Sequence, residues 1–340
     1  MTMLRDALGR LLAVAVLATV LGCANGTADS GSVSVEDLQE QVASLPGVVA
    51  VEAEVTEQDT DYRVLGVDVV VDDGIDADEL AEVLRTAEEL GPRVEADDFG
   101  GSVRRESDAG STDGAQVPTI SLREQSGDPG RRAGGFLTAL AQYPEALVTV
   151  NGGLLTITGV DAEGLRVSEV MGAIADHPLL GHFPSTVVQV EHAAEGLPSA
   201  KVWIDGLITD VAIAHWQTVV DVVATTPVDA APEHVYVLVR DDAIDLAEVS
   251  LGGALPEDVP ADFATWNPVV GPMIEQLLLV AAAAPHEGGT EVDVDGPSGE
   301  LAGVYITDSA APSDYGDPTW CLWAADVVNT AYPAGVHGGA

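Results

Sequence analysis

The sequence predicts an α+β fold built from tandem helix-strand-strand repeats. Three observations support it: amphipathic helical stripes recur along the chain, a proline follows most of them, and two strand-like runs follow most prolines. One such unit cannot bury a two-sided core, whereas two together make a sheet with helices on one face. We therefore expect six units and one closing helix.

The helices are predicted from apolar side chains at i, i+3, i+4 and i+7. Ser34 can cap the first helix, and Asp76 with Glu79 forms a capping-box-like start for the second. The stripes cover 35–45, 80–87, 133–140, 167–174, 212–223, 270–281 and, in a shorter closing helix, about 319–330. Prolines that stop these helices are Pro46, Pro92, Pro144, Pro178, Pro227 and Pro285.

The strands are predicted from β-rich runs after these prolines. They cover 48–55, 64–71, 146–150, 154–158, 186–191, 200–205, 234–239 and 244–251. Asn151-Gly152 suits the type I′ turn of a hairpin. The unit after Pro92 matches least well, because residues 96–116 are rich in Gly, Ser and Asp and predict a flexible loop.

Pairs of units predict ferredoxin-like (split βαβ) sheets with helices on one face. We expect a first module at 35–144, a second at 145–230 and a third, with the C-terminal helix, at 231–340. One continuous sheet system is the alternative to three modules.

The first residues predict the compartment. Arg5 and Arg10 precede a twelve-residue apolar run, which is too short to span a membrane and typical of a signal peptide at 1–22. The run ends at Val20-Leu21-Gly22-Cys23, which resembles the lipobox of bacterial lipoproteins. The resemblance implies diacylation of Cys23, cleavage after Gly22, and a lipidated tether at 23–34 that leads from the extracytoplasmic face of the cell membrane. The alternative is an ordinary secretory signal with a chance cysteine.

Charge excludes two classes of partner. The chain carries 56 Asp and Glu against 13 Lys and Arg, a net charge of −43. Nucleic acids and anionic lipid surfaces require basic patches, so neither is expected as a partner. The Ala-, Val-, Gly- and Asp-rich composition, with the single lysine Lys201, resembles that of lipoproteins of high-GC actinobacteria. The turn at Leu45-Pro46-Gly47-Val48 resembles a strand start of BON domains, which are αββ-built envelope modules.

No motif for catalysis, cofactor or metal is expected. The sequence contains no P-loop, nucleophile elbow, dinucleotide fingerprint or paired-cysteine motif. His177 and His182 would need two more ligands to hold a metal, and a polar loop after a helix is the simpler interpretation. His215 is expected at a surface or boundary. The acidic turns at 72–78 and 293–296 do not fit the EF-hand pattern.

Cys321 is expected to be a buried, inert thiol because it lies between apolar neighbours. Trp320, Trp323 and Tyr332 belong to the core or, alternatively, to a partner surface. A group of arginines lies near the 96–116 loop. It forms either a local basic patch, which would contact a partner or the acidic body of the protein, or a set of separate, solvated charges. Its members are Arg93, Arg104, Arg105, Arg123, Arg131 and Arg132.

The sequence therefore favours a lipid-anchored, non-enzymatic binding or scaffold protein of the cell envelope. Its expected partners are the membrane, through the lipid anchor alone, and an envelope protein, and no cofactor is expected. An envelope hydrolase with a nonstandard carboxylate site is the alternative. A cation-buffering acidic surface without a specific ligand is a third interpretation.

Overall fold

Helices and strands alternate along the chain in the order that the apolar patterns predict. The computed structural model describes residues 32–59, 62–108, 116–124, 127–159, 167–190, 199–225, 232–251, 263–296 and 299–336. The helices are α2 (Val35–Ala43), α3 (Ala77–Leu90), α4 (Pro129–Gln142), α5 (Val167–Asp176), α6 (Asp210–Val223), α7 (Phe263–Ala283) and α8 (Pro318–Ala331).

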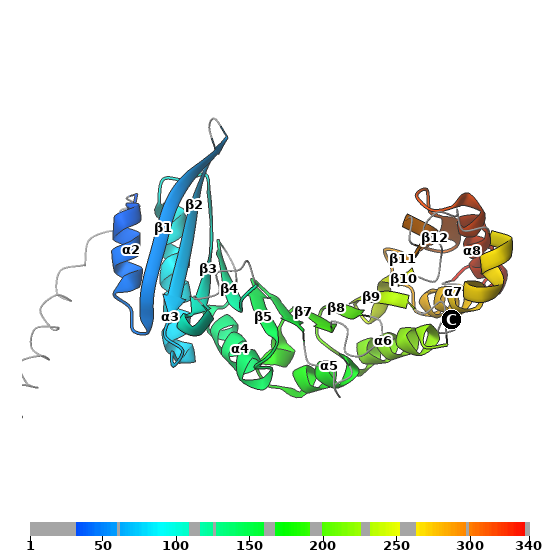
Figure 1. The fold of residues 1–340 in the computed structure, drawn as a ribbon, viewed down its shortest axis with the longest axis horizontal. Helices are drawn as coiled ribbons and strands as arrows, with labels where there is room; N and C mark the ends of the chain where they lie inside the picture. Colours follow the sequence, from blue (N-terminus) through cyan, green and yellow to red (C-terminus); the bar gives the residue numbers. More distant parts are fainter. Residues whose placement is uncertain are drawn as a thin grey trace, which may run out of the picture.

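The strands form one sheet (Figure 1). They are β1 (Val48–Asp59), β2 (Tyr62–Val71), β3 (Asp98–Arg105), β4 (Thr119–Arg123), β5 (Leu147–Asn151), β6 (Leu154–Thr158), β7 (Ser185–Val190), β8 (Ser199–Asp205), β9 (Pro232–Arg240), β10 (Ala243–Leu251), β11 (Thr290–Gly296), β12 (Gly299–Ile306) and β13 (Ala310–Pro312). Short 3-10 helices are η1 (Gly91–Arg93), η2 (Glu106–Asp108) and η3 (Leu180–His182).

Neighbours in the sheet follow the order of the chain, from β1 to β13. The two strands of a unit pair antiparallel, as β1 and β2 do, and the next helix leads to a parallel neighbour, as from β2 to β3. A parallel neighbour requires such a crossover. Six helix-strand-strand units and the closing helix α8 result, which confirms a mixed α and β fold.

The ferredoxin-like arrangement is not confirmed. A split βαβ motif places another strand between the two strands that a helix connects, whereas β2 and β3 are direct neighbours, as are β4 and β5. The sheet also continues across positions 145 and 230. β4 and β5 share two residue pairs at the first position, and β8 and β9 pair along their length at the second. The division into three modules stays a prediction.

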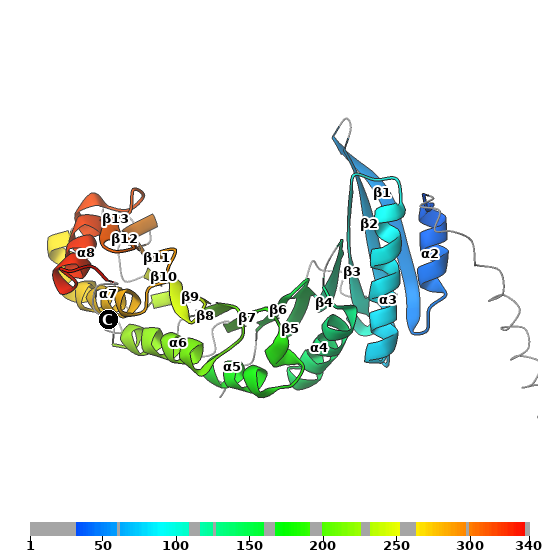
Figure 2. The ribbon, with the colours of Figure 1, turned by 180° about the vertical axis from the view of Figure 1, so that it is seen from behind.

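The units form an arc from β4 to β10, in which α4, α5, α6 and α7 lie along the convex side and the strands along the concave side (Figures 1 and 2). Strand side chains alternate between the two faces. On β2, Leu65, Val67 and Val69 are fully buried under the helices, while Gly66 and Asp68 are exposed. The helix-covered face of the sheet therefore holds the apolar core.

Local capping agrees with the predictions. Ser34 accepts a hydrogen bond from Asp37 N, and Asp76 with Glu79 forms a complete capping box on α3.

The predicted β5–β6 hairpin is also present. Asn151 still pairs with Leu154, so the turn residues are Gly152 and Gly153 rather than Asn151 and Gly152. Only Gly152 has a positive φ, of 59°, as a type II′ turn requires at its first central position.

The predicted loop at 96–116 is wrong for residues 98–105, which form β3. The glycines of this segment obscured the strand pattern in the sequence. At Gly101, close packing of the backbone explains why a glycine is present. A Cβ at Gly101 would overlap the backbone of Val67 on β2, so only glycine permits this close approach. Residues 109–115 lie outside the described residues.

Candidate functional site: the open face of the sheet

The sheet face opposite the helices, here called the open face, displays every second residue of each strand. Pairing registers align these residues into rows that cross the strands. One row contains Thr149, Thr156, Val187, Trp203, Leu238 and Leu246. Apart from the buried Val187, these side chains are all half-buried, because no described helix packs over them.

Four adjacent residues of this row form what we call the apolar strip: Val187, Trp203, Leu238 and Leu246. They come from four neighbouring strands, β7 to β10. The Trp203 indole Nε1 donates a hydrogen bond of 2.6 Å to Oγ of Ser185, which fixes one edge of the ring. The strip thus presents a held aromatic ring among aliphatic side chains on the open face.

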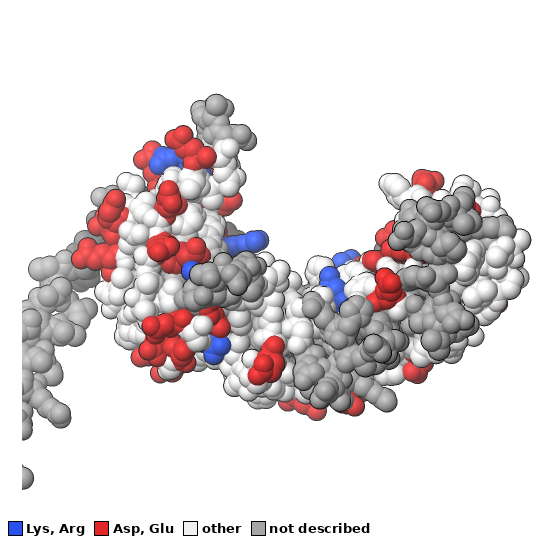
Figure 3. Space-filling view, viewed as in Figure 1, with Lys and Arg blue, Asp and Glu red and all other residues white. Residues whose placement is uncertain are grey.

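Charged and polar residues border the strip. In the next row, Lys201, Tyr236 and Glu248 are cross-strand neighbours. The Lys201 ammonium lies 4.6 Å from the centre of the Tyr236 ring, which is cation–π geometry. Burial, and then the charges of Glu248 and Asp245, raise the pKa of Tyr236 above its ordinary value. Figure 3 shows Lys and Arg atoms facing the hollow of the arc.

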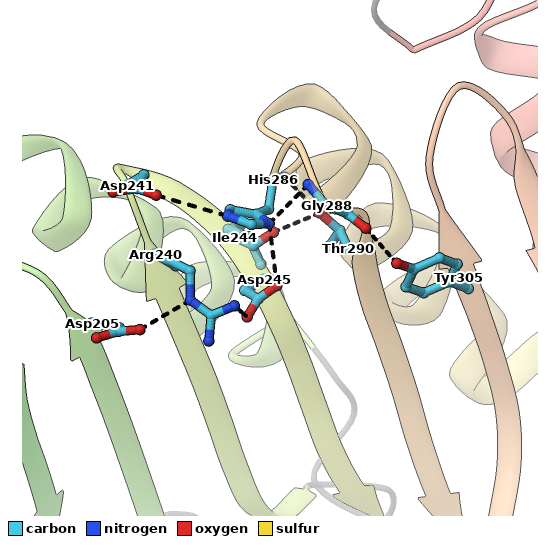
Figure 4. A network of polar contacts seen from close by, with 9 residues as sticks. All are labelled: Asp205, Arg240, Asp241, Ile244, Asp245, His286, Gly288, Thr290 and Tyr305. Carbon is cyan, nitrogen blue, oxygen red and sulfur yellow. Dashed lines mark hydrogen bonds and ion pairs between the residues drawn. The ribbon is translucent and has the colours of Figure 1, made fainter.

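A network forms around Arg240 (Figure 4). It borders the other side of the strip, because Asp205 and Arg240 pair two residues beyond Trp203 and Leu238. Arg240 Nε lies 3.0 Å from Asp205 on β8, and its Nη1 lies 3.1 Å from Asp245 on β10. The Asp205 hydrogen bond and the Asp245 charge raise the Arg240 pKa. Asp245 Oδ1 also lies 3.5 Å from His286 Nδ1, before β11.

Hydrogen bonds to backbone groups hold the His286 side of this network in place. His286 N donates a hydrogen bond of 2.9 Å to Oγ1 of Thr290, and that hydroxyl donates to the Ile244 carbonyl at 2.5 Å. Because these bonds connect β10 with the start of β11, the network fixes this end of the open face. Its exposed Asp205–Arg240 pair adds little stability by itself.

Carboxylates gather where the open face crosses the last strands, β10 to β12. We call this group the acidic end: Glu248, Glu291, Asp293, Asp295 and Glu300. Burial, and then the charges of the other four carboxylates, together raise the Asp293 pKa to about 7. Oε1 of Glu300 is buried without a hydrogen-bond partner.

Gly303 explains how two of these carboxyl groups approach each other. A Cβ at this position would lie 2.9 Å from Oδ1 of Asp293 and would overlap Oε1 of Glu300. Both side chains therefore occupy the space that the glycine leaves. The Glu300 charge is therefore one of those that act on Asp293, after burial and the Glu291 charge.

A small depression lies elsewhere, at the carboxyl ends of β8 and β9. It has a volume of about 160 Å³, and Asp205, Thr209, Asp241 and Asp242 are among its lining residues. Pockets for organic ligands are typically about 300–1,000 Å³. The depression is therefore too small for such a ligand, and the acidic end lies outside it.

The histidines singled out in the sequence are not brought together with further ligands. His177 Nδ1 accepts a hydrogen bond from Leu179 N at 3.2 Å, and His182 ends η3. His215 is half-buried, and its Nε2 contacts the Asp242 carbonyl at 2.9 Å. Among the described residues, no group of three or more His, Cys, Asp or Glu is placed to hold a metal ion.

The acidic segments have different structures. Residues 72–78 lead from β2 into α3, where Asp76 is the helix cap. Residues 293–296 lie in β11 rather than in a turn, which is why Asp293 and Asp295 contribute to the open face. Sequence reasoning considered 293–296 only as a calcium loop and missed its place in the acidic end.

The buried thiol and the core tryptophan agree with expectation. Cys321 is fully buried, burial raises its pKa, and its Sγ accepts a hydrogen bond from Gly303 N at 3.4 Å. Trp320 is fully buried, with its ring centre 4.8 Å from that of Phe263. Trp323 and Tyr332 are half-buried. Cys23 lies outside the described residues.

The arginine group does not form one patch. Arg132 is buried against Glu88, Arg105 pairs with Asp108 at 3.1 Å, and Arg104 lies on β3 opposite Val70 of β2. Sequence reasoning also missed the apolar strip. Its one signal was alternation: Trp203 and Leu238 lie between buried strand residues, which places both opposite the core.

Comparison with known proteins gives no family for this chain. No protein-family model matches it, and no curated protein matches it in sequence. Within the described part of the chain, no helix is long and apolar enough to cross a membrane. The functional argument therefore depends on the open face itself.

Proposed function

We propose that this chain is a lipid-anchored binding protein on the extracytoplasmic face of the cell membrane, and that its open face holds an envelope protein partner. The apolar strip carries this proposal. Trp203, Leu238 and Leu246 are half-buried on the open face, and a partner that covered their remaining apolar surface would gain binding free energy.

The surroundings of the strip favour a protein as the occupant. Protein interfaces combine an aromatic and aliphatic centre with a charged rim that remains wet. Here the rim has both signs, since Lys201 and Arg240 lie near Glu248 and Asp245. A polyanion would meet the carboxylates of the acidic end and the net charge of −43, so nucleic acid is disfavoured.

The anchor rests on the lipobox-like sequence that ends at Cys23. Two or more acyl chains give stable attachment to a membrane, and one alone gives marginal attachment. A Cys23→Ala variant should therefore lose a metabolically incorporated fatty-acid label and leave the membrane fraction. Retention of the label, or of the membrane attachment, would contradict the lipoprotein interpretation.

The open face is tested by photo-crosslinking in cells. A crosslinking amino acid at Leu238 of the open face should give one discrete protein adduct, and the same amino acid at Ala214, exposed on α6, should not. Adding Trp203→Ala to the Leu238 variant should remove the adduct while membrane attachment persists. Equal adducts from both positions, or an adduct that persists without Trp203, would refute the proposed binding face.

A hydrolase with a carboxylate pair is the second candidate. The observation in its favour is Asp293, whose pKa of about 7 suits a proton donor near neutral pH, with Glu300 beside it over Gly303. Release of soluble fragments from purified cell walls should then be lost in Asp293→Asn and retained in Asp295→Asn. Absence of release by the unaltered chain would exclude this candidate for cell-wall substrates.

A further inference from the structure

The two edges of the sheet differ in how they end. Edge strands leave backbone N–H and C=O groups free to pair with another strand, so proteins usually protect them. The C-terminal edge strand β13 has only three residues and ends at Pro312, which has no N–H. The N-terminal edge strand β1 has twelve residues and lies at the opposite end of the sheet (Figure 1).

A side chain closes the β13 edge. Asn329 of α8 accepts a hydrogen bond from Ala310 N at 3.0 Å and donates one to Ala310 O at 3.0 Å. Its amide thus takes the place of a neighbouring strand at Ala310. Together with Pro312, this pairing leaves little backbone for another chain to bind.

The β1 edge is protected less completely. Helix α2 packs beside β1 (Figures 1 and 2), and among the described residues one outward carbonyl of this strand accepts a side-chain hydrogen bond. Gln39 Nε2 of α2 donates a weak hydrogen bond of 3.3 Å to Ala53 O. This bond also shows that the Ala53 backbone points away from β2. On the other side of the pair, Val67 directs its backbone toward Gly101 of β3, which agrees with that orientation. By alternation, Val51 and Val55 also point outward.

We propose that the outer edge of β1 binds an extended segment of a partner protein that has Lys or Arg at every second position. Pairing would extend the sheet by one strand through the outward backbone groups of Val51, Ala53 and Val55. This surface is separate from the apolar strip, so the inference does not depend on the proposed function of the open face.

Charge determines which segment fits. Glu52 and Glu54 are exposed on the open face of β1, with Asp68 of β2 directly opposite Glu52. Basic side chains at alternate positions of an incoming strand would lie beside these carboxylates. Val51, Ala53 and Val55 are half-buried on the other face and would contact apolar residues of that strand.

A second copy of this chain is a poorer occupant. If two β1 strands paired antiparallel about Ala53, Glu52 of each would lie opposite Glu54 of the other. Like charges directly opposite each other destabilise a strand pair. The two glutamates therefore act against self-association and select a basic partner.

The test measures binding of a capped synthetic peptide of alternating Lys and Val to the full chain in detergent. An Ala53→Pro variant removes an outward N–H and no bond to β2, so it should fold normally and bind the peptide about tenfold more weakly. Thermal unfolding checks the fold. Replacing Val by Gly in the peptide should weaken binding, and an alternating Glu-Val peptide should not bind.

Two double variants with the same change in net charge distinguish the effect of the β1 glutamates on peptide binding from the effect of the overall charge. Glu52→Lys/Glu54→Lys should abolish binding of the Lys-Val peptide and allow the Glu-Val peptide to bind. Glu169→Lys/Glu275→Lys, which changes the net charge equally on α5 and α7, should leave binding unchanged. No binding, equal loss in both charge variants, or full affinity in Ala53→Pro would overturn the proposal. So would a dimer of the chain that Ala53→Pro dissociates.

Discussion

Arg132 of α4 lies 2.5 Å from Glu88 of α3, measured from Nη1 to Oε1, and both side chains are nearly closed to water. A second nitrogen of the guanidinium donates to the Ser121 carbonyl on β4. The pair therefore joins two consecutive helices to the strand between them. It is the one ion pair among the described residues in which the cation is fully buried.

Replacing Arg132 by Met should lower the free energy of unfolding by about 3–5 kcal/mol, because Glu88 would remain buried without its partner. Urea unfolding at neutral pH measures the change. Arg131→Met is the control, since Arg131 is exposed and should shift stability by less than about 0.5 kcal/mol. The double variant Arg132→Met/Glu88→Leu should recover much of the loss, and no recovery would contradict this explanation.

Arg132 also shows a limit of sequence reasoning. Helical periodicity predicted α4 from the apolar residues Ala133, Phe136 and Leu140, which are buried. The same pattern cannot show that an arginine beside this stripe turns inward, because its acidic partner lies on another helix. The unit was therefore predictable, but the charge that holds two units together was not.

Gly101→Ala should be strongly destabilising, by about 3 kcal/mol or more, because its Cβ would overlap the Val67 backbone and force β2 and β3 apart. Gly100→Ala is a matched control on the same strand. A Cβ there would meet only the Leu122 carbonyl, at 3.9 Å, which is ordinary contact. Chemical unfolding of both variants measures the difference, and equal stability would argue against a close approach at Gly101.

Asn329→Ala should leave the N–H and C=O of Ala310 without their partners and cost about 1–2 kcal/mol. It should also raise aggregation on mild heating, because the β13 edge would lose its protection. Thermal unfolding with light scattering records both effects. Thr330→Ala, exposed on the same helix, should change neither, and similar behaviour of the two variants would show that Asn329 does not protect the edge.

The open face was only partly predictable. Alternation along each strand indicates which residues face away from the helices, and this holds for Trp203 and Leu238. Which residues become neighbours depends on the register between strands that helices separate in the sequence. Lys201 and Tyr236 meet because β8 and β9 pair in parallel, a relation that no local pattern contains. The acidic end arises in the same way.

Asp293 should make stability fall as the pH rises from about 4 to about 7. Its ordinary pKa is 3.8, and the folded chain raises it to about 7, so the folded state binds more protons within this range. The stabilising contribution is complete below pH 4 and lost above pH 7. Because this side chain is only partly buried, solvent screening limits the free-energy difference to about 1–2 kcal/mol.

An Asp293→Asn variant isolates this effect, because the amide cannot ionise. Its free energy of unfolding should match that of the unaltered chain at pH 4 and exceed it at pH 8 by the amount above. Asp295→Asn controls for the removal of one charge from the acidic end and should give a smaller, more even gain across the range. Parallel stability curves for the unaltered chain and Asp293→Asn from pH 4 to 8 would mean that Asp293 is already ionised at the lower pH. Burial and the neighbouring carboxylates would then not raise the pKa of Asp293 in the folded chain.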